Sequence, residues 1–412
     1  MGAMERFQEF RRAGHLPTLL TAFLYFDVCF SVWVVNGAMA PFISEEFGLS
    51  PAQKGFMVSV PVIAGALMRL PLGILAQYIG RKRAAMLEMS VISACLIWGY
   101  YFTTSLAMVV VMGIALGVAG ASFGVALSLG SGWYPPKYKG LAMGIAGAGN
   151  SGTVIAMLAA PPLALAFGWR TVYLLGLIPM LLAMVLLQVF AKEPPDREDK
   201  KLTDYLKILV DRDAWVFNLM YSVTFGGFIG LASFLPTLFH DHYAIAKQSV
   251  GIYVTMGVIA ASVLRVFGGY FSDKFGGIRV LYTLFAIILL GIGAAATMPA
   301  NPWVMVLAVS ITMGAIGAGN GAVFQLVPLR FRAETAVAGS LIGEIGALAG
   351  GFLPIEMGLG MQHMGSFTPG FLAGIALALS SVLALVFLTR KWTKTWVGAG
   401  GKARVDSLTP AA

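Results

Sequence analysis

The feature of this 412-residue sequence that most constrains its fold is a series of long apolar stretches along its whole length. Each runs for roughly 20 to 28 residues, enough for an α-helix to cross a hydrocarbon layer of about 30 Å. The stretches are continuous runs of Leu, Val, Ala, Gly and Met, whereas a β-barrel would need short alternating segments, so the sequence predicts an all-α membrane protein. The twelve predicted transmembrane helices are residues 18–43, 56–78, 84–103, 105–133, 140–166, 171–191, 214–240, 250–272, 280–299, 302–328, 335–360 and 368–389.

The basic residues are divided unevenly between the loops that join these spans. The net charge is +9, and of the 28 Lys and Arg residues Arg69 and Arg265 lie within spans. Lys54, Arg170 and Lys247 lie in one set of alternate loops, and all the others lie in the set that includes the two termini. This bias predicts a multi-pass protein of the cytoplasmic (inner) membrane with both termini in the cytoplasm. The positive charge therefore indicates orientation in a lipid bilayer rather than a nucleic-acid partner.

Residues that could support other chemistry are few. Cys29 and Cys95 lie within spans, where we expect them to pack as small apolar residues. The sequence therefore gives no indication of a disulfide framework. The histidines lie at termini or span ends, which predicts no metal site; they are His15, His240, His242 and His363. The sequence has no nucleotide-binding loop and no nucleophile constellation. We therefore expect neither an enzyme nor a primary pump, and no cofactor.

A polar segment after the sixth span divides the predicted helices into six and six. It contains the string KEPPDREDKK and predicts an N-terminal half at 1–191, a cytoplasmic linker at 192–213 and a C-terminal half at 214–412. The halves carry a repeat around their second helices, MRLPLGILAQYIGRKR at 68–83 and LRVFGGYFSDKFGGIR at 264–279. Two arginines and two glycines recur in it with an offset of 196 residues. Such duplicated halves place a substrate site between them near the membrane midplane.

Arg69 and Arg265 occupy equivalent positions of this repeat, deep within their spans. Arg69 lies twelve residues before Arg81 and Arg265 nine before Lys274, which corresponds to depths of about 18 and about 14 Å in a helix. Burying a guanidinium there costs at least a few kcal/mol. An ion pair with a carboxylate is one explanation. Because the repeat directs both cations towards one central cavity, we favour a small anion, which the planar guanidinium fork can bind in a bidentate manner.

The loop after each of these helices resembles the cytoplasmic gate motif of the major facilitator superfamily. In that family an acidic residue of the motif anchors the gate. Here the first copy has Gln77 at this place, whereas the second copy keeps Asp273. The resemblance implies the major facilitator fold of two six-helix pseudo-symmetric halves. It also implies a gate that contains Gly73, Gly80, Arg81, Arg83, Gly269, Asp273 and Gly276.

A narrower resemblance, to the nitrate/nitrite porter family, covers nearly all of both halves. It is carried by the arginine contexts AGALMRLPLG (64–73) and SVLRVFGGYFSD (262–273). It is carried also by two glycine-rich strings, GLAMGIAGAGNSGTVIAML (140–158) and AVAGSLIGEIGALAGGFLP (336–354), which resemble the two nitrate signatures of the family. LMYSVTFGGFIG (219–230) matches the segment where the family places a substrate-facing Tyr.

The resemblance implies which residues contact the substrate. Aromatic residues in membrane helices more often pack than bind, but a flat anion between aromatic faces would be selected by shape as well as charge. The glycines are expected to permit close helix contact and sliding rather than to touch substrate. The implied substrate-binding residues are Arg69, Arg265, Tyr221, Asn150, Phe123 and Phe225. The signature glycines are Gly144, Gly147, Gly149, Gly152, Gly343 and Gly346.

Two further carboxylates, Asp27 and Glu344, lie within spans. Carboxylates in a membrane are costly and often functional, so they could couple transport to protons or balance the charge of the arginines. The alternative is that each is satisfied locally.

The sequence thus predicts a secondary transporter of nitrate, nitrite or both that works by alternating access and functions as a monomer. Proton-coupled symport is favoured over nitrate/nitrite exchange. An exchanger of small organic carboxylates, such as oxalate or formate, would also need paired cations. A membrane anion sensor that does not transport is the alternative from another functional class.

Overall fold

The computed structural model of the chain describes residues 3–195, 207–331 and 335–403, and its secondary structure in these ranges is entirely helical. Twelve helices of this described part are long and apolar enough to cross a membrane. The predicted all-α architecture with twelve transmembrane helices is therefore confirmed.

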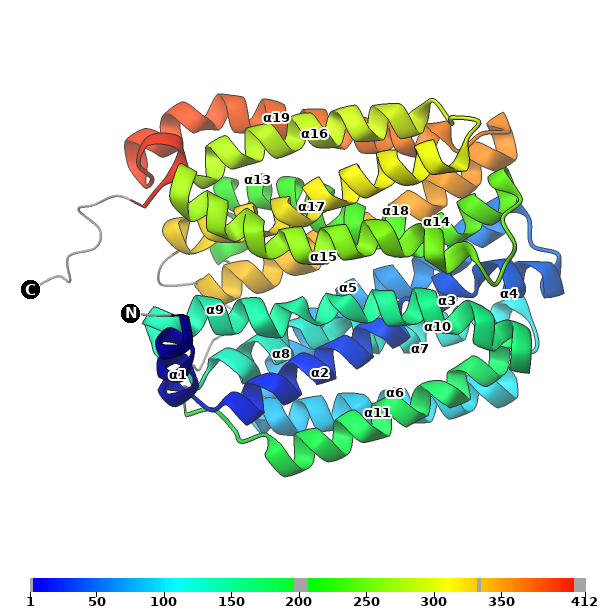
Figure 1. Cartoon of the computed structure of the whole chain (residues 1–412), viewed down its shortest axis with the longest axis horizontal. Coiled ribbons are helices and arrows are strands. Elements are labelled where there is room, and N and C mark those ends of the chain that lie inside the picture. Colours follow the sequence, from blue (N-terminus) through cyan, green and yellow to red (C-terminus); the bar gives the residue numbers. More distant parts are fainter. Residues whose placement is uncertain (1–2, 196–206, 332–334, 404–412) are drawn as a thin grey trace, which may run out of the picture.

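The helices form two groups, one on each side of a central plane (Figure 1). The first group comprises α1 Ala3–Ala13, α2 Leu16–Trp33, α3 Val35–Ala38, α4 Ala40–Phe47, α5 Pro51–Ile79, α6 Arg81–Phe102, α7 Leu106–Gly117, η1 Val118–Ala121, α8 Ser122–Ser131, α9 Pro136–Gly147, η2 Ala148–Ser151, α10 Gly152–Phe167 and α11 Trp169–Phe190. The second comprises α13 Arg212–Tyr221, η3 Ser222–Gly226, α14 Gly227–Tyr243, α15 Val250–Phe275, α16 Gly277–Ala296, α17 Pro302–Arg330, α18 Thr335–Met364, α19 Thr368–Thr395 and η4 Ala399–Gly401.

Local sequence signals set the ends of the long helices. α5 begins with Ser50 and Gln53 in a reciprocal capping box and with Pro51 in its first turn. α5 and α15 both end at a glycine with positive φ, Gly80 (93°) and Gly276 (97°). A residue with a side chain rarely adopts this conformation, so these two glycines make the sharp turns into α6 and α16.

The first predicted span, 18–43, is not one continuous helix. The structure breaks it into α2, α3 and α4, with Val34 and Met39 as the joints. Three later spans also change helical geometry near their middles. They do so through the 3₁₀ turns η1 and η2 and the π-helical turn η3. Such irregular turns within membrane helices often mark functional sites.

The two groups pack tightly against each other at the end that contains α4, which we name the α4 end. A Cβ added to Gly55 of α5 would lie 2.3 Å from the Pro354 carbonyl oxygen of α18. A Cβ added to Gly251 of α15 would lie 1.6 Å from the Met157 carbonyl oxygen of α10. Glycine therefore allows helix backbones of different groups to touch.

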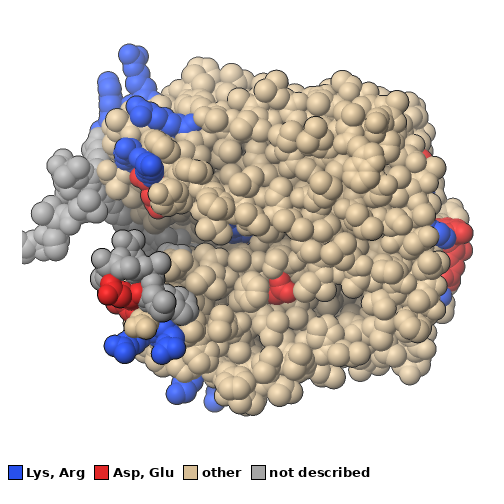
Figure 2. Space-filling view, viewed as in Figure 1, with Lys and Arg blue, Asp and Glu red and all other residues tan. Residues whose placement is uncertain are grey.

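Ion pairs also join the groups at the α4 end. Lys54 Nζ lies 2.6 Å from Asp241 Oδ2, and Lys247 pairs with Glu45. α1 and the end of α19 lie at the opposite end, the α1 end (Figure 1). Figure 2 shows Lys and Arg side chains gathered there, and a hollow in the surface between the two groups towards that end. Contacts between the groups thus close the α4 end, and the surface hollow lies towards the α1 end.

Candidate functional site

Arg69 lies buried in the middle of α5, where carbonyl groups from both helix groups hold its guanidinium. Its Nε donates to the Gly120 carbonyl of η1 at 3.1 Å, and its Nη1 donates to the Gly343 carbonyl of α18 at 2.7 Å. The remaining nitrogen, Nη2, is buried and has no hydrogen-bond partner in the described structure. An unpaired buried donor of a charged group is costly, so this nitrogen is a candidate ligand contact.

Aromatic rings surround the same guanidinium. Its Cζ lies 5.6 Å from the ring centroid of Trp33, 5.3 Å from that of Phe123 and 5.0 Å from that of Phe225. Rings at these distances attract the cation through their π faces. The rings and the two carbonyls together restrict the guanidinium to one orientation.

Arg265 reaches the same cluster of aromatic rings from α15, and the residues around the two guanidinium groups are named the chamber below. Its Cζ lies 5.7 Å from the Phe123 ring centroid, so Phe123 contacts both arginines. Arg265 Nη1 is also buried and unpaired within the described residues. The two guanidinium groups are close enough to repel each other electrostatically. The chamber therefore combines two positive charges with two unused N–H donors.

Tyr221 supplies a third unused donor. Its hydroxyl interacts with both arginines, and Arg265 lies near enough to act only as a donor towards the hydroxyl oxygen; the O–H itself is buried and has no acceptor in the described part of the chain. Its ring stacks on Phe225 at 5.3 Å between centroids, at the start of the π-helical turn. A Cβ at Gly346 would lie 2.5 Å from this ring, so Gly346 leaves the space that the ring occupies.

These groups form one small site with defined chemistry. Three buried donors, from α5, α13 and α15, lie in one cluster with two positive charges, and the rings of Phe123 and Phe225 stack 6.3 Å apart within it. Buried donors without partners and paired cations suit a small anion that accepts several hydrogen bonds. A flat anion fits between aromatic walls better than a bulky one.

Asn150, also predicted to contact substrate, lies buried in η2. With its amide oriented to satisfy its surroundings, its nitrogen donates to the carbonyls of Gly147 (3.3 Å) and Ala148 (3.2 Å). These bonds stabilise the 3₁₀ turn. Among the described residues no hydrogen bond joins Asn150 to either arginine, so the structure does not bring it to the anion-facing donors.

The signature glycines fall into different environments. Gly149 and Gly152 lie against the backbone of α2, where a Cβ at Gly152 would come within 1.9 Å of the Asp27 carbonyl oxygen. Gly147 and Gly343 border the guanidinium groups, with added Cβ atoms 3.9 Å from Arg265 Nη2 and 3.5 Å from Arg69 Nη1. An added Cβ at Gly144 meets no atom within 4 Å.

The two intramembrane carboxylates occupy distinct places. Glu344, on α18, interacts electrostatically with Arg69, and its buried Oε2 has no hydrogen-bond partner among the described residues. Asp27, on α2, accepts a 2.5 Å hydrogen bond from Ser151 Oγ of η2. Glu344 therefore belongs to the charge cluster of the chamber, whereas Asp27 is satisfied by its neighbour.

The gate motifs lie at the α1 end. The backbone N–H groups of Arg81 and Lys82, just after Gly80, donate to the Glu193 carboxylate at 2.7 and 2.9 Å. In the second copy, Gly276 lies against Gly400, and a Cβ there would be 2.3 Å from its carbonyl oxygen. Each turn is thus covered by the segment that follows the last helix of its own group.

The other predicted gate residues form fewer contacts. Neither Asp273 nor Arg83 forms an ion pair within the described part of the chain. A Cβ added to Gly73 meets nothing within 4 Å, and one at Gly269 only reaches Gly321 at 4.0 Å. Among the described residues, Asp273 therefore forms no ion pair that could hold a gate between the groups.

The sequence did not identify two residues near the chamber, Trp33 and Phe324. Trp33 packs on Arg69, and the Phe324 ring lies 5.1 Å from that of Tyr221. Both are aromatic residues in apolar spans, and nothing in their sequence context separates them from packing residues. The helix breaks after Trp33 mark this part of the span as irregular, but the hydropathy pattern does not reveal them.

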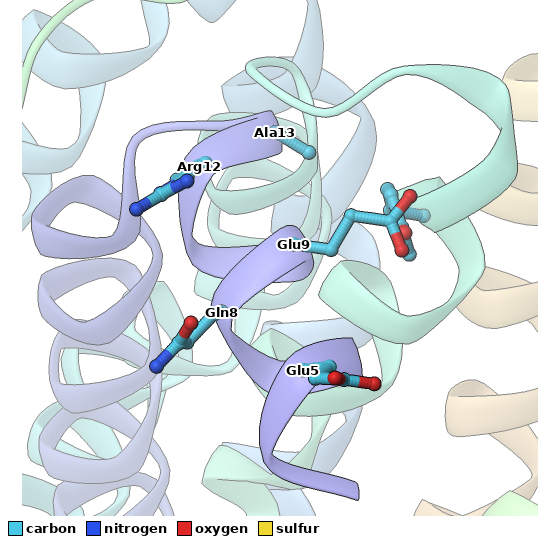
Figure 3. Close-up of a pocket in the computed structure, with 6 residues that line it drawn as sticks. Glu5, Gln8, Glu9, Arg12 and Ala13 are labelled. Atoms are coloured by element: carbon cyan, nitrogen blue, oxygen red, sulfur yellow. The ribbon is translucent and has the colours of Figure 1, made fainter. Parts of the chain in front are cut away.

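A separate surface pocket lies at the α1 end. Figure 3 shows Glu5, Gln8, Glu9, Arg12 and Ala13 of α1 around it, and Tyr138 of α9 completes its lining. It contains none of the residues of the anion-facing chamber. In the described part of the chain no group of three His, Cys, Asp or Glu residues could hold a metal ion.

Comparison with known proteins gives a consistent result. Residues 21–354 match the family described as Major Facilitator Superfamily. The "Nitrite extrusion protein" of Bacillus subtilis is 28% identical, over 87% of this chain and 91% of the relative. The "Probable nitrate transporter NarT" of Staphylococcus carnosus is 32% identical over the same shares. The "Probable nitrate/nitrite antiporter NarK1" of Thermus thermophilus is 29% identical, over 93% and 95%.

A solved structure has the same fold. The xylose transporter XylE from E. coli, in a partially occluded inward open conformation, superposes with a TM-score of 0.71. The match covers 91% of this chain and 97% of XylE, at 17% sequence identity. At this identity the likeness concerns the fold alone, which is that of two six-helix halves.

Proposed function

Because the chain belongs to the nitrate/nitrite porter family of the major facilitator superfamily, and is a multi-pass transporter rather than an enzyme, we propose that it carries nitrate and nitrite across the cytoplasmic membrane. The observation that carries the proposal is the set of unpartnered buried donors on Arg69, Arg265 and Tyr221. Nitrate presents three coplanar oxygens and nitrite two, which match the planar fork of a guanidinium. The names of the relatives support the same two anions.

Transport is proposed to proceed by alternating access between halves at 1–191 and 214–412, with the linker at 192–213 and both termini in the cytoplasm. In this orientation the hollow towards the α1 end faces the cytoplasm, and the Lys54–Asp241 and Lys247–Glu45 pairs close the outer side. Rocking of the halves about the Arg69/Arg265 site would break these pairs and close the cytoplasmic side. Asp273 is free to form its gate contact in that second state. A single chain contains the whole site, so we propose a functional monomer.

We propose proton-coupled import as the transport mode, with Glu344 as the coupling residue. Its unpaired carboxylate oxygen and its electrostatic interaction with Arg69 support this role. The relatives are named as an extrusion protein, a transporter and an antiporter, so their names favour no single mode. Nitrate/nitrite exchange is therefore the competing mechanism.

Flux in proteoliposomes tests the proposal. We expect the purified protein to accumulate nitrate when the pH outside is lower than the pH inside, without any anion trapped in the vesicles. If the protein moves nitrate only when nitrite or nitrate is present on the far side, exchange is the mechanism. Absence of any nitrate or nitrite flux, with binding retained, would favour the non-transporting sensor.

Competition during uptake separates nitrate from small carboxylates. A site with two guanidinium groups and two stacked rings suits a small flat monovalent anion, so excess oxalate, which is longer and divalent, should leave nitrate uptake unchanged. Strong competition by oxalate, or transport of formate in preference to nitrate and nitrite, would support the organic anion exchanger instead.

The variant Tyr221→Phe tests the third donor. We expect nitrate affinity to fall about fivefold, since one hydrogen bond contributes about 1 kcal/mol. The stacking on Phe225 would persist because the ring is unchanged. Isothermal titration of nitrate into the detergent-solubilised protein gives the affinity.

Tyr173→Phe is the matched control for this change. Tyr173 is also fully buried, but its hydroxyl donates to Asn36 Oδ1 at 2.6 Å, within the first group and not to Arg69 or Arg265. We expect this variant to lose some stability and to keep the parent nitrate affinity. If Tyr221→Phe binds nitrate as tightly as the parent, Tyr221 is a packing residue.

A further inference from the structure

Trp33, the last residue of α2, occupies a slot between two glycines. A Cβ added to Gly65 of α5 would lie 2.5 Å from its indole Nε1, and a Cβ added to Gly120 of η1 would lie 2.3 Å from its Cε2. In both cases the three nearest atoms all belong to Trp33. Only a flat ring fits between these two backbone surfaces, and only while both residues are glycine.

A hydrogen bond fixes the indole within this slot. Its Nε1 donates to the Pro61 carbonyl of α5 at 2.7 Å, and Phe30 packs against the ring edge-on at 5.1 Å. Trp33 is 1% exposed. The ring therefore joins α2, α5 and η1 at a single fixed position.

The same ring controls the surroundings of Arg69. It lies 5.6 Å from the guanidinium carbon, and Gly120, which forms one wall of its slot, also accepts the hydrogen bond from Arg69 Nε. A displacement of the indole would thus move both a π face and a hydrogen-bond acceptor of this arginine. The orientation of the remaining free nitrogen, Nη2, would change with them.

We propose that Trp33 is a positioning residue that orients the Arg69 guanidinium for planar anions, with Gly65 and Gly120 as the walls that keep its ring in place. The inference rests on the proposed function, because it assumes that nitrate binds at Arg69. The inference predicts that planar and spherical anions respond differently to a change at Trp33. A planar anion depends on the direction of the guanidinium fork, whereas a spherical monovalent anion such as iodide depends mainly on its charge.

The test compares nitrate and iodide binding by isothermal titration and competition. In the parent we expect nitrate to bind more tightly than iodide. Trp33→Leu, which removes the π face, should weaken nitrate binding about tenfold, within the range of a buried cation–π contact, and leave iodide binding nearly unchanged. Trp33→Phe, which keeps an aromatic ring, should restore most of the selectivity.

Gly120→Ala retains the indole but displaces it, so we expect the same loss of selectivity as in Trp33→Leu. The matched control is Gly124→Ala, one helical turn later, where an added Cβ meets nothing within 4 Å. This control should keep the parent ratio of the two affinities. Gly120→Ala also decides the question if Trp33→Leu fails to fold.

Two results would overturn the inference while the proposed function stands. One is parent-like selectivity in Gly120→Ala or Trp33→Leu, and the other is an equal loss of nitrate and iodide binding, which indicates a general structural defect. A parent protein that binds nitrate no more tightly than iodide overturns the proposed function itself, together with the inference that depends on it.

Discussion

Replacement of either Arg69 or Arg265 by Lys is expected to lower nitrate affinity about 100-fold, since charged hydrogen bonds contribute up to about 3 kcal/mol each. The positive charge remains, but the planar fork is lost. At position 69 the guanidinium serves the carbonyls of Gly120 and Gly343 and still has Nη2 free for the anion. A lysine ammonium group cannot donate to both carbonyls and to the anion in one plane. Titration of nitrate and uptake into proteoliposomes measure the loss.

Arg170→Lys is the matched control for these substitutions. Arg170 lies at the α4 end, where it pairs with Glu46 at 2.6 Å and donates to the Thr103 carbonyl at 2.9 Å. These partners all belong to the first group of helices, far from the chamber. We expect Arg170→Lys to bind nitrate with the parent affinity. All three Arg→Lys variants should be folded and monodisperse. Near-normal nitrate affinity in Arg69→Lys or Arg265→Lys would exclude the proposed anion site.

The number and approximate ends of the membrane helices could be predicted because a bilayer imposes a minimum apolar length. The predicted spans 84–103 and 302–328 correspond to α6 (Arg81–Phe102) and α17 (Pro302–Arg330). The breaks within spans could not be predicted. The joint at Val34 is apolar and continues the hydropathy pattern of the first span without interruption.

The pairing of the arginines was accessible from the sequence because the repeat assigns Arg69 and Arg265 equivalent positions. The structure brings both against the ring of Phe123. The other contacts of Arg69 are main-chain carbonyls, at Gly120 and Gly343. Every residue has a carbonyl, so no sequence pattern could have selected these two.

The carboxylates Asp27 and Glu344 show a different limit of sequence reasoning. Both are single acidic residues within apolar spans, and by composition they are indistinguishable. Only the fold reveals that Asp27 has a hydroxyl donor, Ser151, beside it, whereas Glu344 lies near Arg69. Their environments, rather than their chemical type, separate a locally satisfied group from a candidate for coupling.

The charge of the chamber explains why coupling would need Glu344. Two guanidinium groups and one monovalent anion leave an excess positive charge, and the empty site has two such charges in a medium of low dielectric constant. This charge hinders reorientation of the empty carrier. An ionised Glu344 reduces the excess in the empty state, and it can take up a proton when the anion binds.

Glu344→Gln should therefore abolish nitrate accumulation driven by a pH gradient. The amide has nearly the shape of the carboxyl group but neither ionises nor carries a proton. Counterflow of nitrate against trapped nitrite should continue in this variant, because the bound anion itself supplies the compensating charge in both directions. Asp27→Asn is the matched control. Its amide oxygen can still accept the hydrogen bond from Ser151, so we expect gradient-driven uptake at the parent level.

The combination of assays identifies the role of each carboxylate. Loss of gradient-driven uptake in Glu344→Gln with counterflow intact supports symport through Glu344. The same loss in Asp27→Asn alone would show that Asp27, and not Glu344, is the coupling residue. If the parent protein ignores the pH gradient and exchanges anions only, the empty carrier cannot reorient even with Glu344 ionised. The two positive charges then outweigh one carboxylate, and an anion must accompany every movement of the halves.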